Sequence, residues 1–265
     1  MKNPPIIFSD LDGTLLDYHT YSYSAAEEAL QTCSQKHIPV VFCTSKTRSE
    51  MTYWRQQLSN EHPFIVENGG AIYIPQSYFP FQYHYHSLTE GYHCVKLGTN
   101  LKELIQVLKE LQQHFDISSF LDWDADQIAK ETGLSTQIAA MAREREFDIP
   151  FVIHNTDQDK DIFNTITAKG LTWTKGGRFY HLIGDNDKGK AVHHLIELFE
   201  KKEGTAVHSI GIGDSYNDFP MLNNVDDAYL IQRPDGSYVS DNYKHVTGIG
   251  PDGWNTLILS IINND

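Results

Sequence analysis

The sequence places Asp10-Leu11-Asp12-Gly13-Thr14-Leu15 directly after the apolar run Ile6-Ile7-Phe8. The apolar run predicts a buried first strand, and open α/β sheets bind ligands just beyond the carboxyl ends of their strands. Because glycine permits a tight turn at Gly13, Asp10 and Asp12 can meet at one reaction centre. Two crowded carboxylates need a cation or a proton between them. The alternative is an Asp-Gly turn with an acidic cap, without chemistry.

The rest of the chain alternates short apolar runs with amphipathic stretches. Further buried strands are predicted at 39–43, 64–66, 207–212 and 228–231, and helices at 47–58 and 187–202. Capping boxes, in which a Ser or Thr is followed three residues later by Glu, are predicted at Ser24–Glu27 and Thr47–Glu50. Such alternation is typical of βαβ units with a parallel sheet.

The pattern changes after residue 81 and returns near Asp187. The stretch Tyr83–His86 alternates polar and aromatic residues, which predicts a half-buried antiparallel strand. Leucine and isoleucine at helical spacing then predict a helix over 101–111, and 171–174 with 178–183 read as a hairpin. We therefore expect one α/β core, formed by residues 1–83 and 184–265, interrupted by an α+β insert at 84–183.

A second acidic turn, Gly213-Asp214-Ser215-Tyr216-Asn217-Asp218, follows another predicted buried strand. Together with Asp10 and Asp12 it supplies carboxylates that suit a hard cation, and Mg2+ fits best where a phosphate completes the shell. The alternative is a solvated turn with Asp214 capping a helix. Two further residues fit phosphate chemistry: the Thr44 hydroxyl, which follows the second strand, and Lys188, which can neutralise negative charge. The alternative for Thr44 is a helix cap, and the alternative for Lys188 is an exposed lysine without a role.

Composition limits the partners. The chain has 265 residues, with 35 acidic against 21 basic side chains and a formal charge of −14. This balance argues against nucleic acid and against an anionic membrane surface, since both are bound by excess Lys and Arg. The three cysteines show no CxxC spacing, so neither a disulfide framework nor a thiolate zinc site is indicated. No signal peptide or membrane-length apolar run is evident, so we expect a cytoplasmic protein.

These residues resemble the four motifs of the haloacid dehalogenase (HAD) superfamily of phosphatases. The matching positions are Asp10-x-Asp12-Gly13-Thr14, then Thr44, then Lys188, and finally Gly213-Asp214-x-x-Asn217-Asp218. Over the whole chain the sequence is similar to mannosyl-3-phosphoglycerate phosphatases, in segments 45–50, 67–72, 78–81, 143–147, 177–180, 187–191 and 213–221. The resemblance implies a Rossmann-like core with a parallel sheet and an inserted α+β cap of the C2 type.

The resemblance also implies a mechanism with Mg2+ as cofactor. Asp10 attacks phosphorus and forms an aspartyl-phosphate, and Asp12 acts as the acid and then the base. Either Thr44, which we favour, or Ser45 holds phosphoryl oxygens, and Lys188 offsets negative charge. The metal ligands implied are Asp10, the Asp12 backbone carbonyl and Asp214, with Asp218 in support.

The implied substrate is a small phosphorylated glycosyl-glycerate. Arg145 and Arg178 are candidates for its carboxylate, because Arg matches a carboxylate bidentately. The other candidate substrate-binding residues are Ser45, Lys46, Glu67, Asn68, Gly69, Glu146 and Asn217; a structural salt bridge or an exposed face is the alternative for the charged ones. The sugar can be mannose or glucose, or specificity can be broader. A phosphomutase and a non-catalytic phosphosugar-binding regulator are the competing classes, and the sequence does not reveal the oligomeric state.

Overall fold

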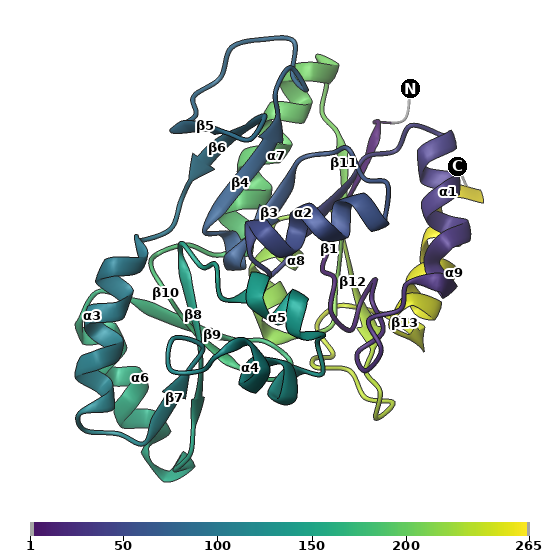
Figure 1. Ribbon diagram of the computed structural model, residues 1–265. Coiled ribbons are helices and arrows are strands. Elements are labelled where there is room, and N and C mark those ends of the chain that lie inside the picture. Colours follow the sequence, from purple (N-terminus) through teal and green to yellow (C-terminus); the bar gives the residue numbers. More distant parts are fainter. Residues whose placement is uncertain (1–2, 264–265) are drawn as a thin grey trace.

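The computed structural model describes residues 3–263, which form two sheets of nine and four strands (Figure 1). Nine α-helices surround these sheets in the described residues: α1 (Glu27–Gln35), α2 (Arg48–Gln57), α3 (Leu101–Gln112), α4 (Ala125–Thr132), α5 (Thr136–Ala142), α6 (Asp159–Ala168), α7 (Lys188–Glu203), α8 (Phe219–Leu222) and α9 (Pro251–Asn263). Four short 3-10 turns accompany them: η1 (Ser24–Ala26), η2 (Glu67–Gly69), η3 (Thr156–Gln158) and η4 (Tyr216–Asp218).

The large sheet has the strand order β13-β12-β11-β1-β2-β3-β4-β6-β5. Its strands are β1 (Pro5–Ser9), β2 (Val40–Cys43), β3 (Phe64–Val66), β4 (Ala71–Pro75), β5 (Ser87–Thr89), β6 (Tyr92–Lys96), β11 (His208–Gly213), β12 (Asp227–Gln232) and β13 (Lys244–Ile249). The six strands from β13 to β3 pair in parallel, and β4, β6 and β5 extend the sheet in antiparallel fashion. The predicted parallel sheet is therefore confirmed, with an antiparallel extension at one edge.

Helices cover both faces of this sheet. Ile6 and Phe8 of β1 pack toward α7 and α8, while Ile7 faces the opposite side, where α1, α2 and α9 lie. The side chains of β1 are thus buried on both faces, as expected for a central parallel strand. The order of the strands puts the carboxyl ends of β11, β1 and β2 side by side at one edge.

The four-stranded sheet belongs to the predicted insert. Its order is β7-β8-β10-β9, with β7 (Ile117–Ser119), β8 (Asp148–Ile153), β9 (Thr172–Lys175) and β10 (Tyr180–Ile183), all antiparallel. Helices α3 and α6 pack on it, while α4 and α5 pair with each other and α5 contacts α2 (Figure 1). We call residues 101–183, from α3 to β10, the cap. The predicted α/β class with an inserted α+β cap is confirmed.

Two local predictions are wrong. The stretch Tyr83–His86 forms no strand; its alternation reflects an aromatic cluster in which Tyr83 packs edge-on against Phe79 and His93. The predicted capping box at Ser24 is absent because the chain begins a 3-10 turn there, without a side-chain cap. The other capping box is confirmed: the Thr47 hydroxyl accepts from the Glu50 amide at 3.1 Å, and the Glu50 carboxylate accepts from the Thr47 amide at 2.9 Å.

The division into 1–83 with 184–265 and an insert at 84–183 stays a prediction. Strands β5 and β6 lie within the predicted insert, yet they hydrogen-bond to β4 and to each other in the large sheet. We therefore propose that the insert begins after β6 rather than at residue 84. In the part of the chain that the structure describes, none of the helices combines the length and apolar character needed to cross a membrane.

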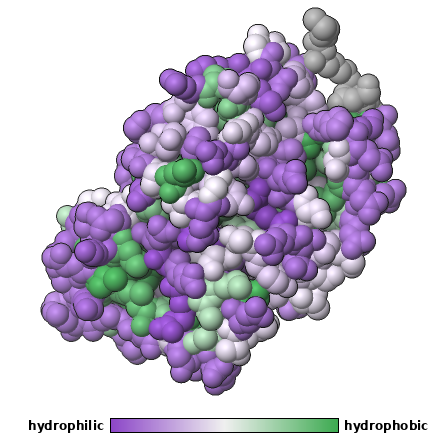
Figure 2. Space-filling model, turned by 45° about the horizontal axis from the view of Figure 1, so that its top comes forward, coloured by the Kyte–Doolittle hydropathy of each residue, from purple (hydrophilic) through white to green (hydrophobic). Residues whose placement is uncertain are grey.

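The face of the molecule in Figure 2 is mostly hydrophilic, and its apolar residues gather in separate patches. This agrees with the composition, in which 21% of the residues are charged. The apolar residues that build the cores lie instead between sheet and helices.

Candidate active site

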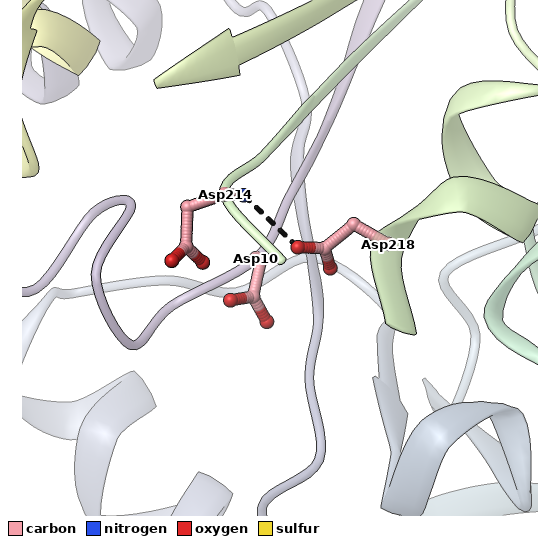
Figure 3. Close-up of side chains that lie close together, drawn as sticks. All are labelled: Asp10, Asp214 and Asp218. Carbon is pink, nitrogen blue, oxygen red and sulfur yellow. Dashed lines mark hydrogen bonds between the residues drawn. The ribbon is translucent and has the colours of Figure 1, made fainter. Parts of the chain in front are cut away.

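Three aspartates meet at the carboxyl edge of the large sheet. Asp10 directly follows β1, Asp214 directly follows β11, and Asp218 ends the turn η4. All three are buried, and one carboxylate oxygen from each lies within 4.8 Å of the others. Figure 3 shows their side chains gathered at one point. The parallel pairing of β1 and β11 brings together two acidic turns that are about 200 residues apart in the chain.

Lys188 neutralises part of this acidic cluster. It is the first residue of α7, and its Nζ lies 2.7 Å from Asp10 Oδ1 and 2.7 Å from Asp218 Oδ1. Its side chain is fully buried. Although burial alone would lower the pKa of Lys188, the Asp10 and Asp218 carboxylates outweigh burial and raise it above the usual range. Lys188 is therefore a permanent cation between two carboxylates.

The cluster still carries excess negative charge. Burial raises the pKa of Asp10 to about 7, although Lys188 acts against this. Burial, and then the neighbouring Asp218 and Asp10 charges, raise the pKa of Asp214 well above its ordinary value. Carboxylate oxygens that destabilise one another's ionised form in this way suit a hard divalent cation. The donor set of Asp10, Asp214 and Asp218 therefore fits Mg2+.

Two glycines make this packing possible. A Cβ at Gly13 would lie 2.9 Å from Asp214 Oδ2, and the backbone there has a φ of +78°, which favours glycine. A Cβ at Gly213 would lie 2.5 Å from the Cβ of Asp218. Asp218 Oδ2 in turn accepts hydrogen bonds from the amides of Asp214 at 3.0 Å and Ser215 at 2.9 Å. The acidic turn is thus held rigidly, with Asp218 supporting Asp214.

The carboxylate of Asp12 lies apart from the three-aspartate cluster. Its Oδ2 accepts a hydrogen bond from Lys46 Nζ at 2.8 Å, and 38% of its side chain is exposed. Lys46 itself is buried beside Glu50, 3.8 Å away, and packs over the Tyr21 ring. Burial acts to lower the pKa of Lys46, but Asp12 and Glu50 raise it overall. In this structure Asp12 is therefore partly exposed and forms an ion pair with Lys46.

The two hydroxyl candidates differ in their surroundings. Thr44 follows β2 and is buried, and its Oγ1 accepts a hydrogen bond from the Lys46 amide at 3.2 Å. Ser45 lines the cavity into which Asp10 and Asp12 open. The hydroxyl hydrogen of Thr44 is free to rotate toward a phosphoryl oxygen, so both residues remain candidates.

The cavity lies between the core and the cap. From the core it is lined by Asp10, Asp12 and Asp214, and from the cap by Arg145, Phe179, Arg178 and His181. Five of the predicted substrate-binding residues line it, namely Ser45, Lys46, Arg145, Arg178 and Asn217. Residues of the acidic cluster and residues of the cap therefore line one cavity.

The two cap arginines are bound differently. Arg145 forms an ion pair with the buried Asp148 at 3.1 Å and donates to the Ser45 carbonyl at 2.9 Å. Arg178 donates to the carbonyls of Thr132 and Tyr18 and lies over the Tyr18 ring, and among residues 3–263 it has no carboxylate partner. Arg178 is thus the cavity cation whose charge is left to attract an anion.

The other predicted substrate-binding residues do not line the cavity. Glu67 is fully buried, and its carboxylate accepts from the amides of Glu146 at 3.0 Å and Phe147 at 2.8 Å. Asn68 donates to Asp148 at 2.7 Å, and a Cβ at Gly69 would lie 2.0 Å from the Asp187 carbonyl oxygen. Glu146 contacts Tyr73 at 3.2 Å. In this structure Glu67, Asn68 and Glu146 join core and cap, and Gly69 packs against the start of α7 within the core.

Comparison with known proteins agrees with this geometry. A family model described as haloacid dehalogenase-like hydrolase matches residues 7–234, a span that contains Asp12 and the three clustered aspartates. The chain belongs to the haloacid dehalogenase-like hydrolases. It is 43% identical to a glucosyl-3-phosphoglycerate/mannosyl-3-phosphoglycerate phosphatase of Methanococcoides burtonii, over 98% of each chain. It is 37% identical to a mannosyl-3-phosphoglycerate phosphatase of Pyrococcus furiosus, over 92% of this chain and 96% of the relative.

The fold is shared with more distant members of the family. The chain superposes on a HAD subclass IIB sugar phosphatase with a TM-score of 0.66 at 13% identity, over 98% of each chain. The predicted superfamily, the resemblance to mannosyl-3-phosphoglycerate phosphatases and the prediction of an enzyme are thus confirmed.

Sequence reasoning missed a polar group in the cavity of this HAD hydrolase. His181 of β10 lines the cavity, and its Nδ1 lies 2.9 Å from a carboxylate oxygen of Asp148 on β8. The two residues are 33 positions apart and meet only because β8 and β10 pair in antiparallel fashion. The one available signal was the polar His181 directly before the apolar pair Leu182-Ile183 in the predicted strand.

Proposed function

We propose that this HAD hydrolase is a Mg2+-dependent phosphatase that converts mannosyl-3-phosphoglycerate to mannosylglycerate and phosphate through an aspartyl-phosphate. By its family and its named relatives the chain is a phosphoric monoester hydrolase. The observation that carries the proposal is that Asp10, which is paired with Lys188, lines a cavity that also holds Arg178, a cation without a carboxylate partner among residues 3–263.

In the proposed mechanism the chain positions the phosphate and stabilises charge, since phosphoryl transfer asks little more of the protein. Asp10 attacks phosphorus in line. Asp12 protonates the leaving glycerate oxygen and later takes a proton from the water that hydrolyses the intermediate. Lys188 lies 2.7 Å from Asp10 and offsets the charge that Asp10 shares with the phosphate. Thr44 or Ser45 donates a hydrogen bond to a phosphoryl oxygen.

Mg2+ would be held by Asp10, Asp214 and the backbone carbonyl of Asp12, with Asp218 in support. The metal supplies positive charge that neutralises the phosphate and favours the ionised form of Asp10. The raised pKa values of Asp10 and Asp214 support this assignment, because a bound cation relieves the cost of keeping these buried carboxylates ionised.

The carboxylate of the substrate is proposed to bind Arg178. This guanidinium lines the cavity without a carboxylate partner in the described part of the chain, whereas Arg145 is already paired with Asp148. Arg145 is therefore proposed to order the cap rather than to bind substrate directly. The same structural role is proposed for Glu67, Asn68 and Glu146.

Glucosyl-3-phosphoglycerate is the second candidate substrate, because the relative from Methanococcoides burtonii is named for both sugars. A phosphomutase would need the phosphate to pass to a second hydroxyl, and a non-catalytic regulator would not need the intact acidic cluster that the structure contains.

The test is phosphate release from mannosyl- and glucosyl-3-phosphoglycerate, glucose-6-phosphate, sucrose-phosphate and 3-phosphoglycerate, each with Mg2+ or with EDTA. We expect Mg2+-dependent release with a preference for the glycosyl-3-phosphoglycerates and no need for a bisphosphate activator. Equal rates across the panel would refute the proposed substrate, and an Asp10→Asn variant with wild-type turnover would refute the proposed nucleophile.

A further inference from the structure

His181 is held in one orientation by a fully buried carboxylate. Its Nδ1 lies 3.0 and 2.9 Å from the two oxygens of Asp148. Asp148 also accepts hydrogen bonds from Arg145 at 3.1 Å and from Asn68 at 2.7 Å. Although burial acts to raise the pKa of Asp148, His181 and Arg145 hold it below its ordinary value, so the carboxylate stays ionised. A carboxylate behind a histidine fixes which ring nitrogen carries the proton.

The other ring nitrogen faces the cavity. Among residues 3–263 no hydrogen-bond partner contacts His181 Nε2. The atom keeps some solvent-accessible surface, unlike the buried polar atoms that lack a partner. His181 lines the same cavity as Asp10 and Asp12. Gly176 lies beside it, and a Cβ there would approach Nε2 to 3.4 Å. The absence of a side chain at Gly176 leaves the approach to Nε2 open.

The chemistry of this nitrogen selects a ligand group. When Nδ1 donates its proton to Asp148, Nε2 of the neutral imidazole carries a lone pair and accepts a hydrogen bond. In that tautomer Nε2 can bind a hydroxyl, and its lone pair repels a carboxylate or a phosphate. In a glycosyl-3-phosphoglycerate the glycerate carries a carboxylate, a phosphate ester and a glycosidic oxygen. The only free hydroxyls of such a substrate are those of the sugar.

We propose that His181 is a specificity-determining residue whose Nε2 accepts a hydrogen bond from a sugar hydroxyl of the substrate, and that Asp148 is the positioning residue that aims it. This inference rests on the proposed function and deepens it. In this proposal the cavity holds both a cation, Arg178, and a hydroxyl-binding group, His181, on the cap, opposite Asp10 and Asp12 of the core.

The experiment compares two amide substitutions. His181→Asn places an amide near the Nδ1 position and keeps a donor for Asp148 but removes the acceptor from the cavity. His181→Gln places its amide near the Nε2 position. His193→Asn is the matched control, because His193 lies on the surface of α7 and pairs with Glu197 at 3.5 Å. The measurements are kcat and KM for mannosyl- and glucosyl-3-phosphoglycerate, the inhibition constant of inorganic phosphate, and Tm.

We expect His181→Asn to raise KM by about tenfold, the loss of one good hydrogen bond, while the phosphate inhibition constant and Tm stay near wild type. His181→Gln restores most of the affinity, and His193→Asn changes nothing. An unchanged KM in His181→Asn, or an equal rise in the phosphate inhibition constant, overturns the inference. If the wild-type enzyme itself shows no preference for glycosyl-3-phosphoglycerates over 3-phosphoglycerate, the proposed function fails first and this inference falls with it.

Discussion

Lys188 is the residue whose removal tests the charge balance of the site most directly. It is the only basic side chain, among the described residues, that is paired with Asp10 and Asp218. Replacing it by methionine keeps most of the length and volume of the side chain but removes its charge. The Lys188→Met protein then holds two buried carboxylates that have lost their shared counter-charge, beside the third at Asp214.

The expected cost follows from the geometry. At 2.7 Å and an effective dielectric constant of about 20, each ion pair is worth roughly 6 kcal/mol of Coulomb attraction. Desolvation of the buried ions costs several kcal/mol each and cancels much of this gain. Breaking a buried pair by removing one partner costs about 3–5 kcal/mol. With two carboxylates affected, we expect the upper part of that range, out of a total stability of about 5–15 kcal/mol.

The assay is urea unfolding followed by circular dichroism, in EDTA at pH 7.5. Lys190→Met is the control, because Lys190 is half-exposed on the same helix and pairs with the exposed Asp185 at 2.8 Å; exposed pairs of this kind contribute about 0–1 kcal/mol. The double variant Lys188→Met/Asp218→Asn should recover part of the lost stability, since it removes one uncompensated charge. A Lys188→Met protein within 1 kcal/mol of wild type, by the same scale, would refute the reasoning. We also expect its kcat to fall by about 10²–10³.

Three further predictions concern pH, metal and substrate. Burial raises the pKa of Glu67 to about 8 from an ordinary 4.5, so the folded state binds this proton more tightly than the unfolded chain does. The resulting contribution to stability is complete below about pH 4.5 and is lost as the pH rises to about 8. Urea unfolding at several pH values should show that Glu67→Gln reduces the fall in the free energy of unfolding over that window by a few kcal/mol. A Glu67→Gln protein with the wild-type pH slope would contradict this. Mg2+ at a hundred times its Kd should stabilise the wild type by about 2.7 kcal/mol, measured as a higher Tm with Mg2+ than with EDTA. Asp214→Asn should abolish most of this rise in Tm. A variant with the full rise would show that Asp214 is not a metal ligand. Arg178→Met should raise KM for glycosyl-3-phosphoglycerates by about 10–100-fold, because a charged hydrogen bond is lost. KM for glucose-6-phosphate, which has no carboxylate, should change little. An equal rise in KM for both substrates would argue against a substrate carboxylate at Arg178.

Most of the fold could be predicted from the sequence because local patterns specify its strands and helices. The run Ile6–Phe8 is buried on both sides of the sheet, and the capping box at Thr47 begins α2 as predicted. One of the two local failures came where an alternating pattern had a tertiary cause. Tyr83 alternates with its polar neighbours because its ring joins an aromatic cluster with Phe79 and His93, and not because it belongs to a strand.

The acidic turns were found from sequence because each follows an apolar strand at a fixed spacing, and parallel strands deliver their carboxyl ends to one edge. The local sequence does not show which basic side chains in the cavity have a carboxylate partner. Arg145 and Arg178 are equivalent in sequence terms, but the fold pairs the first with Asp148 and leaves the second without a carboxylate partner in residues 3–263.

The sequence by itself determined that Asp10 and Asp12 follow a buried strand, that a second acidic turn follows another, and that an α+β insert separates them. Only the tertiary structure decided what each charged group faces. Lys188 lies between Asp10 and Asp218, Asp12 pairs with Lys46, and His181 is aimed by Asp148. The physical reason is that strand order and helix packing set these distances over separations of about 30 to 180 residues, and at such range no local propensity or spacing specifies a partner.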